Sequence, residues 1–439
     1  MTFRDRLPYL ENLSRETLQR WGRRTLFVIG GLLVGAAAIL MAALADFAQR
    51  DFHRLLGISR YLSLALTPLG FGAIVFLTLK VFPNSQGSGI PQVIAARELP
   101  DGPTRTSLVS LRVAIGKIVS VTLGLLCGAS IGREGPTVQV GAALMNAVGR
   151  GAIEYQRGLL LAGAAAGIAA AFNTPLAGIV FGIEELSRSF ESRTSGLVLG
   201  AIIAAGLTSL SLVGNYAYFG STNAVLPLGR AWLVLPICAV LGGLFGGLFS
   251  RIVITFARGL PGALGRLIAR HPIVFAMLCG LGVALTGLLS QDTSYGTGYD
   301  EARAIVHGAA PACAIFGLMK FLATLFSAIG GIPGGLFAPS LAVGAGLAAN
   351  LHTLFQDVPL GALALLGMVS YLTGVVQTPI TSFVIVSEMT ENRTMIIPLM
   401  LAAVIADAVS KSICKDSIYH ALAAVFLKNA GETPIQEPE

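Results

Sequence analysis

Two glutamates in otherwise apolar sequence are the residues of this chain that are best suited to chemistry. Glu134 stands in the segment GREGP, and Glu185 follows Glu184 late in the apolar run FNTPLAGIVFGIEEL. A carboxylate inside a membrane segment costs about 2.5 to 3.5 kcal/mol to insert, so an acid there predicts a function. The alternative for Glu134 is an ion pair with Arg133, which is less favoured because adjacent helical residues point in different directions. Arg133 is better interpreted as a structural anchor.

Three clusters of glycine and proline interrupt the apolar sequence, and each is typical of the start of a helix. They are GSGIP at Gly87–Pro91, GREGP at Gly132–Pro136 and GIPGGLFAP at Gly331–Pro339. Proline is favoured in the first helical turn, where the other N–H groups are unpaired and about half a positive charge collects. Several such ends meeting at the bilayer midplane would bind a small, mobile anion without a buried arginine or lysine. Ser88 could add a hydroxyl donor.

Competition between this anion and Glu134 predicts linked movement of anions and protons. An ionised Glu134 can occupy the anion site itself, while a bound anion favours the neutral acid. Helix starts that attract anions repel protons, so the proton path needs a second acceptor inside the protein. Glu184 and Glu185 are the candidates, and a solvated helix end is the alternative interpretation for both.

The elements that must position these residues are membrane-spanning helices. Of the 439 residues, 54% are hydrophobic and 12% are charged, against roughly 25% charged residues in soluble domains. Five charge-free stretches reach the length of a bilayer-spanning helix, namely Thr25–Ala45, Tyr61–Leu79, Leu159–Ile183, Pro272–Ser290 and Val358–Ser387. We therefore predict an all-α polytopic membrane protein whose natural partner is a lipid bilayer. Its 53 glycines indicate closely packed and partly broken helices.

The net charge of +7 reflects membrane topology rather than binding of nucleic acid. Most of the excess is spread over polar connections. Arginines precede the first span at positions 4, 6, 15, 20, 23 and 24, which by the positive-inside rule places the amino terminus in the cytoplasm. Residues 1–22 are predicted to form a cytoplasmic helix and do not resemble a cleaved signal peptide.

Cysteine and histidine predict neither disulfides nor metal binding. The five cysteines are Cys127, Cys238, Cys279, Cys313 and Cys414, and the five histidines are His53, His271, His307, His352 and His420. The cysteines are odd in number and lie mostly in apolar runs, which is typical of small core residues. The histidines are too scattered to form a ligand pair. We expect no metal and no cofactor.

The chain contains two related halves. Gly132, Pro136, Val140, Gly141, Ala142 and Leu144 recur 203 positions later as Gly335, Pro339, Val343, Gly344, Ala345 and Leu347, and Lys117 recurs as Lys320. Thr174, Pro175 and Glu184 recur 204 positions later as Thr378, Pro379 and Glu388. Duplicated membrane halves commonly adopt opposite topology around a shared site. We predict inverted repeats at 23–214 and 228–413, followed by a carboxy-terminal helix and short tail at 414–439.

The three clusters together resemble those of the CLC family of chloride channels and chloride/proton antiporters. GSGIP, GREGP and a GxFxP stretch written GGLFAP occur in the order of that family, and the likeness extends from about Arg23 to Leu427. The resemblance implies a homodimer with one anion pathway in each subunit. It also implies a bacterial inner-membrane protein, with cytoplasmic termini, that exchanges chloride for protons. The residues after Leu427 are too few for the paired regulatory domains of many larger relatives, so we expect none here.

The same resemblance assigns roles to individual residues. It makes Ser88, the backbone amides of Leu336 and Phe337, and the hydroxyl of Tyr419 the chloride-binding groups. Glu134 matches the gating glutamate of the family. Glu185 matches the internal proton-transfer glutamate that is typical of its antiporters and usually absent from its channels.

One departure and two alternatives remain open. Gln92 stands where many relatives carry an acid, which leaves the internal proton route undefined. A passive chloride channel of the same fold is the nearest alternative, and Glu185 argues against it. A more distant one is an intramembrane serine hydrolase, because GASIG at Gly128–Gly132 fits the pattern G-x-S-x-G. We expect its serine, Ser130, to be a packing residue.

Overall fold

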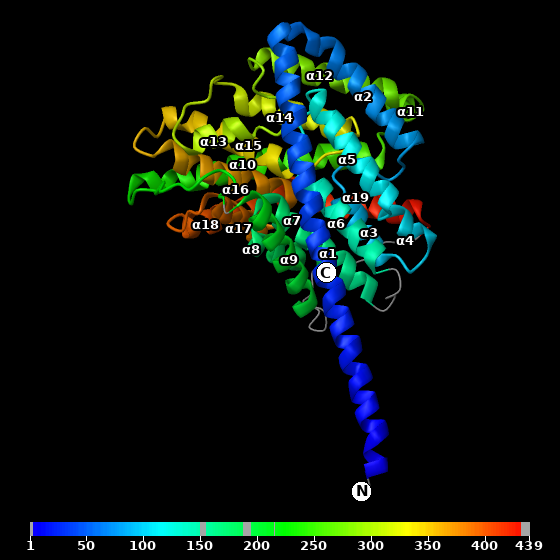
Figure 1. Ribbon diagram of the computed structural model, residues 1–439. Coiled ribbons are helices and arrows are strands. Elements are labelled where there is room, and N and C mark those ends of the chain that lie inside the picture. The colour runs from blue at the N-terminus through cyan, green and yellow to red at the C-terminus, as the bar shows by residue number, and fades with distance from the viewer. Residues whose placement is uncertain (1–2, 150–154, 188–194, 215, 432–439) are drawn as a thin grey trace.

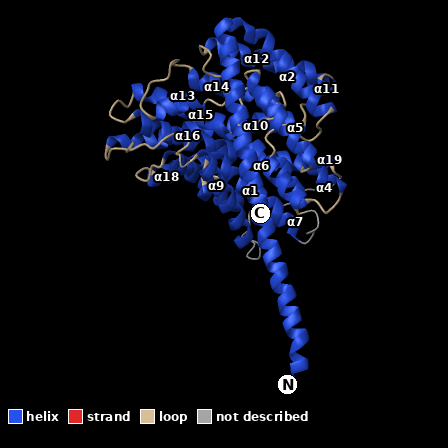
Figure 2. Ribbon diagram, in the orientation of Figure 1, coloured by secondary structure: helices blue, strands red, loops and turns tan. Residues whose placement is uncertain are grey.

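The described part of the chain is built almost entirely from helices joined by loops (Figures 1 and 2). The computed structural model describes residues 3–149, 155–187, 195–214 and 216–431, with the backbone alone for residues 3–20 and 195. Helices of the first half are α1 (Phe3–Ile58), α2 (Ser63–Lys80), α3 (Ile90–Glu98), α4 (Pro103–Leu108), α5 (Leu111–Leu126), α6 (Glu134–Val148), α7 (Gln156–Phe172), α8 (Pro175–Phe181) and α9 (Ser195–Val213).

The second half repeats this pattern of long and short helices. Its helices are α10 (Val234–Arg258), α11 (Gly262–Arg270), α12 (Pro272–Leu289), α13 (Tyr299–Val306), α14 (Phe316–Ile329), α15 (Phe337–Ala349), α16 (Leu360–Val376), α17 (Pro379–Thr390), α18 (Ile396–Ile413) and α19 (Ile418–Asn429). Short 3₁₀ turns are η1 (Arg60–Leu62), η4 (Arg230–Leu233) and η5 (Asn350–Thr353), and a π-helical segment, η3 (Gly182–Ser187), follows α8.

Seven described helices are long and apolar enough to cross a membrane. They are Trp21–Ile58, Arg60–Lys80, Pro103–Leu126, Gly196–Val213, Arg230–Arg258, Pro272–Leu289 and Ile396–Ile413. Many of their apolar side chains are exposed, as on α9 and α18, and lipid is the solvent that suits them. The prediction of an all-α polytopic membrane protein is confirmed.

The first helix crosses the boundary that was expected near residue 22. α1 continues without a break from Phe3 to Ile58, so the predicted cytoplasmic helix and the first span form one rod. Figure 1 shows the amino-terminal part of this rod extending away from the body of the molecule.

Two predicted spans, Leu159–Ile183 and Val358–Ser387, are not single helices, and that prediction was wrong. The first is divided into α7 and α8 and the second into α16 and α17. At each break a residue adopts the left-handed conformation, Asn173 with φ 56° and Gln377 with φ 58°. A Thr-Pro pair follows each of them, and the proline begins the next helix because its missing N–H is not needed there.

The broken helices of the two halves cap one another. The Glu388 carboxylate accepts hydrogen bonds from the N–H groups of Leu176 (3.2 Å) and Ala177 (2.8 Å) at the start of α8. The Glu184 carboxylate accepts them from Ile380 (3.1 Å) and Thr381 (2.6 Å) at the start of α17. Both contacts pair a negative charge with the positive end of a helix. We call this pair of contacts the reciprocal caps.

Candidate functional site

Main-chain hydrogen bonds join the three glycine and proline clusters. Gly132 and Gly335 exchange two of them, with N···O distances of 2.8 and 2.7 Å, and form an isolated antiparallel bridge between equivalent positions of the two repeats. The N–H of Gly334 donates to the carbonyl of Gly87 at 3.1 Å. The starts of α3, α6 and α15 therefore converge in the interior of the protein.

Glycine is needed at this junction because the backbones approach too closely for a side chain. A Cβ atom at Gly135 would lie 2.5 Å from the Ser88 Oγ atom and 3.2 Å from the Cα atom of Gly335. A Cβ atom at Gly335 would lie 2.8 Å from the backbone nitrogen of Gly135. Real Cβ atoms do not make such contacts, so larger residues here would push the helix starts apart.

Each repeat uses a fully buried lysine to hold a glycine-rich loop. The Lys117 ammonium group donates to the carbonyls of Gln86 (3.2 Å) and Gly87 (2.9 Å), before α3. The Lys320 ammonium group donates to three successive carbonyls, including that of Gly296 at 2.8 Å, before α13. These lysines are structural ties within the backbone, which agrees with an anion site that uses helix starts instead of cations.

The Lys320 loop contains a second copy of the serine-bearing motif. Gly296-Thr297-Gly298 precedes α13 as Gly87-Ser88-Gly89 precedes α3, and all four glycines have positive φ. The sequence comparison missed this copy because it is displaced by 209 positions instead of 203. The hydroxyls of Ser88 and Thr297 have different partners. Thr297 Oγ1 donates a hydrogen bond to Gln49 Oε1 at 3.1 Å, whereas Ser88 Oγ makes no such bond to a side-chain amide among the described residues.

The predicted chloride-binding groups lie together at the start of α15. Ser88 and Tyr419 are buried, their hydroxyls interact, and within the described residues neither hydroxyl makes a well-formed hydrogen bond. The Tyr419 ring stacks on Phe337 with a centroid distance of 6.2 Å. The amides of Leu336 and Phe337 are at the helix start, where N–H groups lack partners within the helix. Donors without acceptors in a buried place suit an anion.

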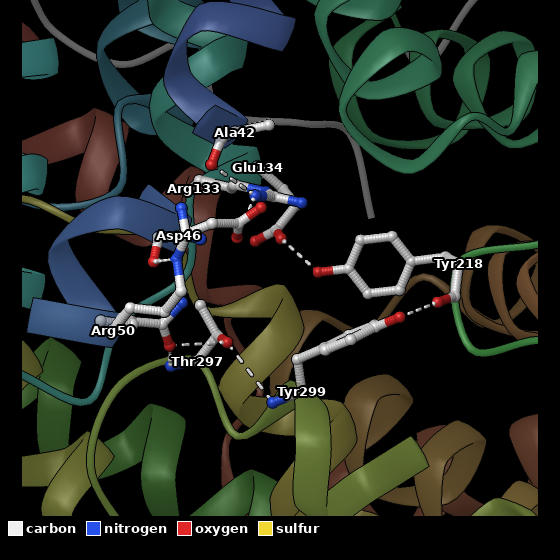
Figure 3. A network of polar contacts seen from close by, with 9 residues as sticks. Ala42, Asp46, Arg50, Arg133, Glu134, Tyr218, Thr297 and Tyr299 are labelled. Carbon is white, nitrogen blue, oxygen red and sulfur yellow. Dashed lines mark hydrogen bonds and ion pairs between the residues drawn. The ribbon is translucent and has the colours of Figure 1, made fainter. Parts of the chain in front are cut away.

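Glu134 reaches from the first turn of α6 to the start of α15. Its side chain is fully buried. The backbone N–H groups of Glu134 and Ala338 donate hydrogen bonds to its carboxylate. The hydroxyl of Tyr218 donates to Oε1 at 3.4 Å, a long hydrogen bond that Figure 3 shows. The carboxylate therefore lies against the helix start of the other repeat and away from lipid.

Arg133 makes its hydrogen bonds with α1 and so ties the start of α6 to that helix. Its Nη1 atom donates to Asp46 Oδ1 at 2.9 Å and to the carbonyl of Ala42 at 3.0 Å (Figure 3). Its guanidinium carbon lies 6.0 Å from the centre of the Tyr218 ring. The contacts are those of a structural anchor.

Tyr218 is a residue of the site that the sequence did not predict. It lies in the connection between the repeats, and its buried ring packs edge-on against Phe172 (5.5 Å), Phe219 (5.0 Å) and Tyr299 (5.0 Å). Tyr299 also donates its hydroxyl to the Tyr218 carbonyl at 2.7 Å (Figure 3). The only sequence signal was a group of aromatic residues in the polar connection GNYAYFGSTNAV.

The two candidates for the internal proton acceptor have different surroundings. Glu184 is engaged in one of the reciprocal caps. Glu185 is buried within η3 and faces α19, where His420 Nε2 lies 3.1 Å from its carbonyl oxygen and 3.5 Å from its Oε1 atom. Tyr419 precedes this histidine, so α19 contacts both the anion-binding groups and Glu185.

Comparison with known proteins identifies the family. The model of the family described as voltage gated chloride channel matches residues 69–411. This chain belongs to that family, the CLC family.

Known CLC proteins match nearly the whole chain. The H(+)/Cl(−) exchange transporters ClcA of Yersinia pestis bv. Antiqua (strain Angola) and Yersinia pseudotuberculosis serotype O:3 (strain YPIII) are each 30% identical over 452 positions, which cover 94% of this chain and 90% of the relative. Among solved structures, a slow cyanobacterial Cl⁻/H⁺ antiporter has a TM-score of 0.77 at 24% identity, covering 93% of this chain and 98% of the other. A CLC-type fluoride/proton antiporter has a TM-score of 0.76 at 24% identity, covering 92% and 98%. The structures show that the fold is shared.

Two cavities of this CLC chain lie beside the site and are lined by different residues. One, of about 560 Å³, is lined by Arg133, Tyr218 and acidic residues of α1 and α13. The other, of about 300 Å³, is lined by Ser88, Leu336 and residues of α19. The Glu134 region lies beside the first and the Ser88 region beside the second.

Ser130 has the surroundings of a packing residue. Its hydroxyl pairs with that of Thr324 at 2.9 Å, and its N–H donates to Ser327 Oγ at 3.1 Å. A nucleophilic serine needs a base within hydrogen-bond reach, and these neighbours are hydroxyl groups. Membership of a transporter family also argues against the hydrolase.

Proposed function

We propose that this protein is a chloride/proton antiporter and that Glu134 is its gate. One observation carries the proposal: a fully buried carboxylate from α6 lies at the first turn of α15, next to the Gly135 position that contacts Ser88. It thus occupies a place where an anion would find the same donors. The exchange activity named for the Yersinia relatives supports the proposal.

The exchange follows from competition for these donors. While Glu134 is ionised, its carboxylate accepts from its own N–H, from the N–H of Ala338 in the first turn of α15 and from the Tyr218 hydroxyl. Protonation removes its charge, so chloride can take those donors together with the hydroxyls of Ser88 and Tyr419 and the amides of Leu336 and Phe337. Loss of the proton restores the competing carboxylate and expels the anion. One chloride step is thereby tied to one change in the charge of Glu134.

Glu185 is the proposed internal acceptor of the proton. It is the buried member of the Glu184–Glu185 pair and lies beside α19. A separate route is needed because the amide groups that attract chloride repel a proton. A passive chloride channel remains the second outcome, to be decided by the transport experiment below.

We further propose that the protein is a homodimer in a bacterial inner membrane, with both termini in the cytoplasm. Exposed apolar side chains gather on α8, α9, α17 and α18, which Figure 1 shows together on one side of the body. A second copy covering this face would bury them. Light scattering of the purified protein in detergent should give the mass of two chains, and a monomer would reject this assembly.

The function is tested by reconstitution into liposomes. An outward chloride gradient is imposed while internal pH is recorded, and protons should move uphill into the vesicles. Glu134→Ala should abolish that movement, and Ser130→Ala, at a packing position, should leave it intact. A reversal potential that does not respond to pH would select the passive channel instead.

A further inference from the structure

We propose that His420 relays protons between the cytoplasmic solution and Glu185. The proposal rests on the proposed antiport and concerns a step that Glu185 cannot complete alone. The Glu185 side chain is only 2% exposed, whereas the His420 side chain beside it is 24% exposed. A buried acceptor needs a neighbour that reaches the surface, and His420 is partly exposed and lies against Glu185.

The first turn of α19 places two successive side chains in two different surroundings. Ser417 stands at the N-cap position, and the helix begins at Ile418. Adjacent helical residues point about 100° apart. Tyr419 accordingly lies buried among the anion-binding groups, while the next residue, His420, reaches η3 and places Nε2 3.1 Å from the Glu185 carbonyl oxygen and 3.5 Å from its Oε1 atom. Both transport paths therefore meet at one helix turn.

The proton balance of the relay is simple. Neutral His420 carries its hydrogen on Nε2, and water delivers a proton to Nδ1. The Nε2 proton then passes to Oε1 of ionised Glu185, leaving a neutral ring and a neutral acid. The separation of 3.5 Å must shorten to about 2.6 to 3.2 Å for transfer, as is common when such contacts tighten during turnover. Exchange of the ring hydrogen through water resets the relay, and the reverse sequence releases the proton.

Histidine is the suitable side chain for this position because it gains and loses protons near neutral pH. The other charged groups on the elements that pack against α19 are Glu184 of η3, Arg97 and Glu98 of α3, and Arg251 and Arg258 of α10. Arg97 donates to the Leu186 carbonyl, which fixes the end of η3, and Arg258 pairs with Asp416 at 2.5 Å. The guanidinium groups remain charged at all relevant pH values and cannot carry the proton.

Gln92 does not offer an alternative route. Its amide nitrogen donates to the carbonyls of Asn84 (3.3 Å) and Gln86 (2.6 Å), so it closes the loop before α3. An amide does not titrate in water. On α19, by contrast, the titratable ring of His420 lies 3.5 Å from Glu185 Oε1.

The test compares proton and chloride movement through wild-type protein and His420→Gln in the same liposome assay. Glutamine keeps a donor for the Glu185 carbonyl but cannot titrate. Proton flux should fall by about tenfold or more, chloride flux should persist, and proton flux should lose its dependence on internal pH. His352→Gln, at an unrelated histidine of η5, should behave like wild type.

A second variant separates relay from structure. His420→Glu keeps a titratable group of similar reach, so it should restore pH-dependent proton flux, with the dependence moved to lower pH because carboxylic acids titrate there. Calorimetric binding of chloride shows that each variant is folded; if glutamine prevents folding, His420→Asn replaces it.

The possible failures can be distinguished. Wild-type proton flux in His420→Gln across the pH range would overturn the relay and leave the antiport standing. Equal, pH-independent loss in the glutamine and glutamate variants would also overturn it, because His420 would then act only by packing. Absence of proton movement in the wild-type protein would overturn the antiport, and the relay with it.

Discussion

The two repeats share their backbone plan but differ at the side chains that do chemistry. Gly132 and Gly335 bond to each other at equivalent positions, and the reciprocal caps use equivalent glutamates. Lys117 and Lys320 hold equivalent loops. At these framework positions both repeats carry the same residue.

The differences lie at four positions around the site. Arg133-Glu134 of the first repeat corresponds to Leu336-Phe337 of the second, and Glu185 corresponds to Met389. Ser88 corresponds to Thr297, whose hydroxyl is engaged with Gln49. Both repeats supply helix starts that attract an anion, but only the first supplies the proposed titratable groups. In the proposed mechanism, anion binding therefore draws on both repeats, whereas proton coupling depends on residues of the first.

Replacing Glu134, the proposed gate, should have the largest effect, because it removes the titratable group that distinguishes the first repeat from the second. In Glu134→Ala the first repeat no longer carries a titratable group at its helix start, as in the second. Proton transport should fall roughly 100-fold, whereas chloride flux should persist and lose its pH dependence. Simultaneous chloride and pH recordings on liposomes measure both. Surviving coupled proton movement would mean that the gate is another residue.

Replacing the internal acceptor should have the next largest effect. Glu185→Met gives the first repeat the residue found at Met389, and Glu185→Gln is the variant of matched shape. Both should reduce proton movement by about tenfold or more while chloride still passes. Normal proton pumping in either variant would contradict the assignment, and Glu184 would then be the next residue to test.

The reciprocal caps, which both repeats share, should affect the stability of the protein but not the coupling of chloride to proton transport. Glu388→Gln weakens one reciprocal cap by exchanging a charged acceptor for a neutral amide, at a cost of about 1 to 2 kcal/mol. Denaturation in detergent should show this loss, and the number of chloride ions moved per proton should remain that of wild type. A changed ratio would show that the caps also serve transport.

The smallest effect should come from the hydroxyls at equivalent positions of the two repeats, those of Ser88 and Thr297. Ser88→Ala removes a donor at the helix starts and should weaken chloride binding by about 1 kcal/mol, or fivefold. Thr297→Ala is the matched control in the other repeat and should bind chloride as wild type does. Isothermal titration calorimetry measures both, and equal weakening would place Thr297 in the binding path as well.

Local signals made much of this arrangement predictable. Proline and glycine mark the starts of α6 and α15 directly, and a carboxylate in apolar sequence marks Glu134. The helix breaks at Asn173 and Gln377 were missed because each is a single left-handed residue inside a charge-free stretch. A hydropathy criterion does not respond to such a change of conformation.

Contacts between distant segments were beyond the reach of the sequence. Tyr218 meets Glu134 across 84 positions, and His420 meets Glu185 across 235. No motif encodes such a meeting, because it depends on how the connection between the repeats and α19 fold back on the core. The role of Glu184 was undecided for the same reason, since its partners lie in the other repeat.

The bridge between Gly132 and Gly335 has a consequence for how the two sides of the membrane are reached in turn. Many transporters rock one half against the other, but here that motion would break two main-chain hydrogen bonds at the very centre of the molecule. In an interior without water, neither N–H group would find another hydrogen-bond acceptor. The anion path would therefore be opened to one side of the membrane or the other by movements of side chains. The backbone of the two repeats would stay fixed at this bridge.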